Sequence, residues 1–115
     1  MRYMILIYGN EAAAASATPE QRQAEMAAHL AYSQEMRASG ALLGGDALHP
    51  TSAATSVRVR DGKTLTTHGP FAETTEQLGG FYLIECANLD EALVWAAKNP
   101  SSSYGTIEVR PVWEF

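Results

Sequence analysis

The chain has 115 residues, which fits one domain, residues 1–115, with a single hydrophobic core. Its formal net charge of −5 leaves no basic surface for nucleic acid or an anionic membrane. The single cysteine, Cys86, excludes an internal disulfide, and no stretch approaches the roughly 20 apolar residues that span a bilayer. These properties predict a cytoplasmic protein without a nucleic-acid or membrane partner.

The chain begins with a predicted strand and a predicted helix. Residues 2–8 (RYMILIY) are apolar on both alternating faces, which is typical of a strand that is covered on both sides. Thr18 is a good N-cap, and Gln21 stands where it completes a capping box. The helix should end just before Gly40. Spacings of three and four predict its buried side chains as Met26, His29, Leu30, Ser33 and Met36.

A second strand and a β-hairpin follow this helix. Residues 41–48 (ALLGGDAL) predict the strand, with Gly44-Gly45 marking a bulge or a close backbone approach. Residues 55–67 predict the hairpin. A three-residue loop, 60–62, would keep the apolar side chains of both strands on one face, so we prefer it to a two-residue turn at Asp61-Gly62.

The last part of the chain repeats the strand–helix–strand order. Residues 79–86 predict a strand with two apolar faces, and Asn88 caps the next helix. Residues 106–112 predict the final strand. The side chains expected to be buried by the helix are Leu89, Ala92, Leu93 and Ala96, and those buried by the final strand are Ile107 and Val109.

This element order predicts an α+β fold of the ferredoxin-like βαββαβ type, with the hairpin as an addition. Two helices can cover only one face of such a sheet, so the other apolar face would be exposed in a monomer. Two copies that pair through these faces would form a dimeric α+β barrel. We therefore expect a homodimer.

His29 and Asp46 are the first candidates for chemistry. The path back from Gly40 to His29 covers about 16 Å of helix, and the path from Ala41 to Asp46 covers about 16 Å of strand. The two side chains are therefore expected at the same height. A carboxylate beside an imidazole suits general acid–base catalysis near neutral pH. The alternative is a core histidine that is hydrogen-bonded to a convenient acid.

The loop from His68 to Glu73 is the second candidate. His68, Phe71 and Glu73 could bind a substrate, since loops at strand ends often carry function. The alternative for Phe71 is a side chain that plugs into the core. The three histidines do not stand at metal-ligand spacings and Cys86 reads as an inert core thiol, so neither a metal nor a cofactor is expected.

The segments RYMILIYG, LLGGDAL, HGPFAETTEQLGGFYLIE and LDEALVWAAKNP resemble the YCII-related proteins, and more closely their DGPF-domain branch. The resemblance implies a ferredoxin-like dimeric α+β barrel with an active site on a His–Asp pair, here His29 and Asp46. The branch is named for an Asp before Gly-Pro-Phe, where this chain has His68. Some relatives belong to enzymes of aromatic breakdown, and many DGPF proteins are linked to transcriptional regulation.

Three functions follow from these observations. The first is an enzyme in which His29 is the general acid or base, Asp46 orients it, and the substrate is a small organic molecule. The second is a non-catalytic ligand-binding or transcription-linked regulatory module with the same dimeric fold. The third is a subunit that only binds another protein.

Overall fold

A computed structural model describes residues 1–115 and shows an α+β fold built on a four-stranded antiparallel sheet. The strands are β1 (Arg2–Gly9), β2 (Leu42–Ala47), β5 (Gln77–Glu85) and β6 (Thr106–Pro111), in the order β2-β5-β1-β6. The α+β expectation is confirmed, and the arrangement is compatible with a ferredoxin-like fold.

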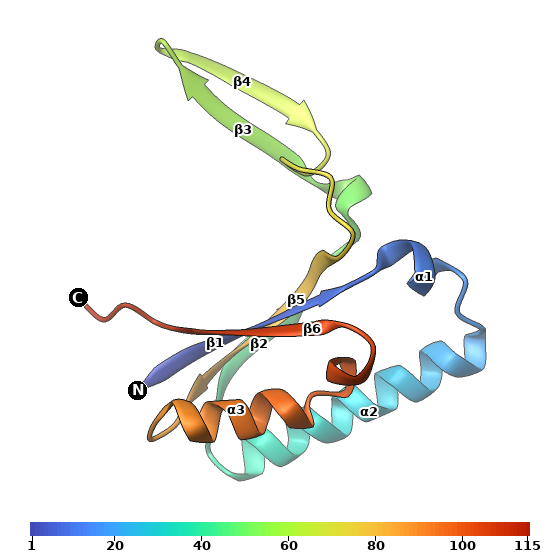
Figure 1. Ribbon diagram of the computed structural model, residues 1–115, viewed down its shortest axis with the longest axis vertical. Helices are drawn as coiled ribbons and strands as arrows, with labels where there is room; N and C mark the ends of the chain where they lie inside the picture. Colours follow the sequence, from blue (N-terminus) through green and yellow to red (C-terminus); the bar gives the residue numbers. More distant parts are fainter.

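Two helices, α2 (Pro19–Ala38) and α3 (Leu89–Lys98), lie on one side of this sheet (Figure 1). Both hydrogen bonds of the predicted capping box are present, at 3.1 Å to the Thr18 hydroxyl and 2.8 Å to the Gln21 side chain. Gly40 follows α2 with a φ of +83°, which glycine adopts without steric cost. The predicted bounds of α2 are confirmed to within about a residue. None of the helices is long and apolar enough to cross a membrane.

A short helix, α1 (Glu11–Ala15), and two 3-10 turns, η1 (Thr51–Ala53) and η2 (Pro100–Ser103), complete the fold. The sequence analysis read the α1 region as a connection. However, the Asn10 side chain accepts a hydrogen bond from the Ala13 amide at 3.0 Å and caps the helix. Alanine has the highest intrinsic helix propensity, so this cap is enough to order one turn.

The core lies between the sheet and the two helices. The Tyr32 ring packs edge-on against Tyr82, with ring centroids 5.3 Å apart, and against Trp95 at 6.2 Å. Its hydroxyl donates a hydrogen bond of 2.8 Å to the Trp95 carbonyl. The buried members of the core are Tyr3, Ile5, Tyr32, Met36, Ala41, Ile84, Cys86, Ala92 and Trp95.

The predicted buried faces of both helices need correction. Met26 is 73% exposed and Leu30 is 57% exposed, whereas Tyr32 and Met36 are buried. In α3, Leu89 and Leu93 are each 48% exposed while Ala92, Trp95 and Ala96 are buried. The large rings of Tyr32 and Trp95 meet between the helices and the sheet, and their burial turns the aliphatic residues outward. Ile107 and Val109 of β6 pack against the core, as predicted.

Of the bulge or close backbone approach predicted at Gly44-Gly45, the close approach occurs at Gly45, and a bulge lies just before the two glycines, at Leu43. The register between β2 and β5 shifts between Leu42 and Gly44. A Cβ atom on Gly45 would lie 2.5 Å from the Phe81 carbonyl oxygen, closer than real Cβ contacts come. Glycine is therefore required at position 45 for the close approach of the two backbones.

The hairpin of β3 (Thr55–Arg60) and β4 (Lys63–His68) projects from the body, on the side away from α2 and α3 (Figure 1). Its turn has two residues, with φ of 52° at Asp61 and 74° at Gly62, so the preferred three-residue loop is wrong. Two positive φ values match the type I′ turn, whose twist suits the flanking strands. Arg58 therefore stands opposite Leu65.

The face of the sheet away from the helices, called the open face below, is apolar and only partly covered. Tyr3 and Ile5 of β1 point to the helices, so the alternating Met4, Leu6 and Tyr8 point to the open face. Paired residues on neighbouring strands share a face, which adds Phe81 and Leu83 of β5. Both faces of the sheet are apolar, as the sequence of residues 2–8 predicted.

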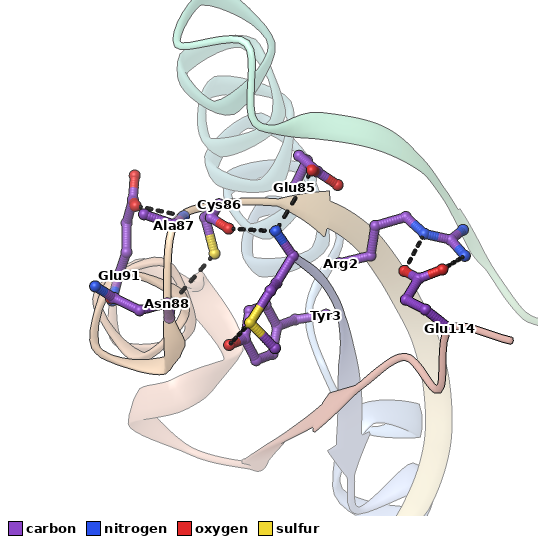
Figure 2. A network of polar contacts seen from close by, with 9 residues as sticks. Arg2, Tyr3, Glu85, Cys86, Ala87, Asn88, Glu91 and Glu114 are labelled. Carbon is purple, nitrogen blue, oxygen red and sulfur yellow. Dashed lines mark hydrogen bonds and ion pairs between the residues drawn. The ribbon is translucent and has the colours of Figure 1, made fainter.

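Polar contacts tie the two chain ends to the sheet. The N-terminal ammonium group donates a hydrogen bond of 2.9 Å to the Cys86 carbonyl. Figure 2 shows the Arg2 guanidinium facing the Glu114 carboxylate, and its two hydrogen bonds measure 2.8 and 2.9 Å. The hydrogen bonds and the charge of Arg2 lower the pKa of Glu114. The C-terminal segment is thus held beside β1.

Candidate functional site

His29 belongs to a polar chain on the helix side of the sheet. Its half-buried ring places Nε2 3.0 Å from the Oγ atom of Ser101, a buried residue in η2. The Ser101 Oγ atom lies 3.4 Å from the Tyr104 hydroxyl, which donates a hydrogen bond to the Glu25 carboxylate. These contacts join α2 to the segment between α3 and β6, so His29 holds parts of the fold together.

Asp46 lies on the other side of the sheet. It pairs with Phe81 across β2 and β5, and Phe81 pairs with Leu6, which places all three on the open face. No hydrogen bond or ion pair joins His29 to Asp46. The contact expected between these two side chains is therefore not made within one protomer, although their catalytic roles stay a prediction.

The bulge in β2 explains the position of Asp46. Leu42 pairs with Ile84, whose side chain points to the helices. Simple alternation would place Asp46, four residues later, on that same face. The register shift after Leu42 adds one residue to β2 and moves every later side chain to the opposite face. The path lengths of about 16 Å placed His29 and Asp46 at the same height along their elements, but they could not show on which face of the sheet Asp46 lies.

Burial lowers the pKa of His29 below its usual 6.5, and the charge of Glu25 opposes the shift only in part. The unfolded chain therefore takes up this proton at a higher pH than the folded chain. The stability that neutral His29 contributes is fully present above about pH 6.5, and is lost as the pH falls below it.

We expect His29→Gln to reduce the pH dependence of stability. Urea unfolding at about pH 7.5 and pH 5.5 should show a larger loss of unfolding free energy for the wild type than for the variant, because only the wild type protonates at this position. Comparing the two proteins removes the other titrating groups. An equal loss in both proteins would contradict the structural role of the neutral ring.

The larger of the two best-defined cavities lies at the base of the hairpin. It has a volume of about 490 Å³ and 13 lining residues, of which six are hydrophobic. The lining comes from residues 48–50, which follow β2, and from η1, the start of β3, residues 70–74 and the start of β5. This volume is in the range of small-molecule sites.

Most polar side chains that line this cavity already form hydrogen bonds within the protein. The Thr51 hydroxyl donates to the Glu11 carboxylate at 2.7 Å, and the Ser56 hydroxyl donates to the Gly69 carbonyl at 2.9 Å. Those of Thr74 and Gln77 are also hydrogen-bonded. His49 is the polar lining residue whose side chain forms no hydrogen bond. It is thus the group that is free for a ligand.

The predicted loop residues divide into two groups. Phe71 is 80% exposed and lines both this cavity and a smaller one of about 130 Å³ beside the hairpin, so the alternative in which it plugs the core is wrong. His68, opposite Thr55 in the hairpin, lines neither cavity, and neither does Glu73.

The sequence analysis missed Leu48, His49 and Leu78 as cavity residues. A signal for His49 is present, because His49-Pro50 directly follows a predicted strand and strand ends often carry functional groups. Cys86 is buried as predicted, and burial raises the pKa of its thiol. No three His, Cys, Asp or Glu residues converge in a way that could hold a metal ion.

Comparison with known proteins agrees with the resemblance read from the sequence. The family described as the YCII-related domain matches residues 1–115. An uncharacterized protein of Rhizobium meliloti (strain 1021) is 41% identical over 114 residues, which are 97% of this chain and 92% of that protein. The narrower assignment to the DGPF branch stays a prediction. The chain belongs to the YCII-related domain family.

Proposed function

We propose that this protein is a homodimer that binds a small, largely apolar organic molecule in the cavity at the base of the β3–β4 hairpin. The observation that carries the proposal is the cavity itself, with a volume of about 490 Å³ and a lining that combines six hydrophobic residues with the exposed imidazole of His49, which forms no hydrogen bond. Such a site accepts an apolar body together with one acidic or hydrogen-bonding group, which His49 would contact.

The dimensions of the chain support the homodimer. A folded monomer of 12.4 kDa exposes about 6,100 Å² by the usual scaling, whereas this chain exposes 8094 Å². Its radius of gyration is 16.1 Å, against about 13 Å for a compact domain of this length. The excess area is large enough for a stable protein–protein interface. Pairing through the open faces would give the dimeric α+β barrel.

Binding has better support than catalysis by the His–Asp pair. His29 and Asp46 lie on opposite sides of the sheet, and His29 lines neither of the two described cavities. In contrast, Phe71 and His49 line the same cavity. Acid–base chemistry by His29 with Asp46 would need the two side chains to be in contact, and within one protomer they are not. The imidazole of His49 could contact a ligand or transfer a proton to it.

We expect Phe71→Ala and His49→Ala each to weaken binding of 8-anilinonaphthalene-1-sulfonate, an apolar aromatic anion, by about 5- to 10-fold. Loss of an aromatic contact or of one solvent-accessible hydrogen bond costs on the order of 1–1.5 kcal/mol. Fluorescence titration measures the dissociation constant.

The chain offers a matched control for each of these variants. Phe115→Ala removes a fully exposed phenyl ring, and His68→Ala removes a histidine that lines neither cavity. Both controls should bind the dye like the wild type. Equal affinity of Phe71→Ala and the wild type would refute the site.

A further inference from the structure

A second, smaller cavity adjoins the larger one at the base of the hairpin. It has a volume of about 130 Å³ and is lined by Ser56, Arg58, Leu65, Thr67, Pro70 and Phe71. Three of these residues, Ser56, Pro70 and Phe71, also line the larger cavity. The smaller cavity is below the size of a site that holds a small molecule by itself, which starts at about 300 Å³. It therefore suits one functional group of a ligand whose body fills the larger cavity.

One face of the hairpin forms most of this smaller cavity. The four hairpin residues in its lining make two cross-strand pairs, Ser56 with Thr67 and Arg58 with Leu65. Paired residues point to the same side, and so do residues two apart on one strand. The rest of the lining, residues 70–71, follows β4 in the chain. The cavity thus lies where this face of the hairpin meets the segment that leaves it.

Arg58 gives the smaller cavity a free positive charge. Its side chain forms no hydrogen bond and no ion pair within the protomer. No Asp or Glu lines either cavity, although the chain contains 13 acidic residues. The carboxylate of Glu11, which contacts the lining residue Thr51, accepts two hydrogen bonds of 2.8 and 2.7 Å. The charged side chain that lines the site is therefore positive in a chain of net charge −5, which favours an anionic ligand.

The chemistry of the smaller cavity matches a carboxylate better than a phosphate. A guanidinium group presents parallel N–H donors that fit the two oxygens of a carboxylate. Phosphate sites commonly add the N-terminus of a helix, and no α-helix contributes to the lining of either cavity. The one guanidinium of Arg58 balances one negative charge. A monovalent carboxylate is therefore the group that this cavity suits.

The position of Phe71 indicates what the carboxylate is attached to. Its side chain lines both cavities and is 80% exposed, so an aromatic ring of a ligand can pack against it. The open-face residues that would meet in the proposed homodimer line neither cavity; they are Met4, Leu6, Tyr8, Phe81 and Leu83. The ligand site and the pairing of the sheets thus use different residues.

We propose that the ligand of this site is an aromatic carboxylate. Its carboxylate group pairs with Arg58 in the smaller cavity, and its ring packs on Phe71. The rest of the molecule occupies the larger cavity, where His49 is left for a hydrogen-bonding group of the ligand. The inference rests on the proposed function and names the class of molecule that the cavity binds.

Isothermal titration calorimetry with naphthalene-2-carboxylate and naphthalene-2-carboxamide tests the inference. The two compounds have nearly the same shape, but only the first is charged at neutral pH. The wild type should bind the carboxylate about 5-fold more tightly than the amide, a modest ratio because Arg58 is exposed to solvent. Arg58→Gln should bind the two compounds alike, since glutamine keeps hydrogen-bonding capacity but carries no charge.

The matched control is Arg60→Gln. Arg60 lies two residues further along the same strand and points to the same side of the hairpin, but it lines neither cavity. The substitution removes the same charge as Arg58→Gln does. This variant should keep the preference of the wild type for the carboxylate. Loss of the preference in both variants would reveal a general effect of charge and would overturn the pairing with Arg58.

Three other results would overturn the aromatic carboxylate as the ligand. They are equal affinity of the wild type for the two compounds, no measurable binding of either, and a preference that Arg58→Gln retains. The dye titration tests the cavity separately. If Phe71→Ala weakens binding of 8-anilinonaphthalene-1-sulfonate, the proposed function stands and only the ligand class fails. Dye binding that Phe71→Ala leaves unchanged overturns both.

Discussion

Met36→Ala is expected to lower the free energy of unfolding by about 2–5 kcal/mol, the usual cost of truncating a fully buried methionine. Met36 has no exposed surface and lies where α2 meets the core. A domain of this size is typically stable by about 5–15 kcal/mol, so this single change should remove a large share. Urea unfolding followed by circular dichroism measures the difference.

Met26→Ala is the matched control for this prediction. It makes the same substitution in the same helix, ten residues earlier, at a position that is 73% exposed. Its cost should stay within about 0.5 kcal/mol, as for most surface changes. The pair also tests which face of α2 is buried. Similar losses in the two variants would contradict the packing of α2 described above.

Local signals in the sequence determined the ends of the elements well. The cap at Thr18, the cap at Asn88 and the stop at Gly40 are all present in the structure. Each of them depends on hydrogen bonds or backbone angles within a few residues, so the sequence contains the needed information. The same holds for the close backbone approach at Gly45, which two adjacent glycines indicated.

Packing between elements was predicted less well, because it depends on residues far apart in the chain. The outward position of Leu30 follows from the contact of Tyr32 with Trp95, which lies on another helix. The predicted register of the hairpin was wrong for a related reason. The three-residue loop was chosen because it gathers apolar side chains on one face, as a hairpin that packs on the core would need. In the protomer, however, the two strands of the hairpin form a separate sheet that does not pack on the core.

The positions of the candidate site residues were also hard to predict from local sequence patterns. A bulge was one of the two alternatives predicted at the glycines, but its consequence for Asp46 was not predicted, because a shift of one residue exchanges the two faces of a strand. The cavity residues come from two stretches of the chain, residues 48–56 and 70–78, and no local pattern marks the two stretches as neighbours. His49 could have been proposed from its place at a strand end, whereas Leu78 could not.

Leu83→Lys is expected to weaken the proposed homodimer by on the order of 100-fold or more. Leu83 lies on the open face between Gly44 and Met4, which itself pairs with Arg110. A lysine there would carry an unpaired charge into the interface, and an uncompensated buried charge costs about 3–5 kcal/mol. In a symmetric dimer the charge enters twice. Sedimentation velocity at micromolar concentration should show the loss of the dimer.

Leu93→Lys provides the control for this change. It adds the same charge at a leucine that is 48% exposed on α3, which covers the other side of the sheet. This variant should remain dimeric, because α3 takes no part in the pairing of open faces. Circular dichroism separates dissociation from unfolding, since a Leu83→Lys monomer should keep its helices. A Leu83→Lys protein that stays dimeric would show that the two sheets do not meet through this face.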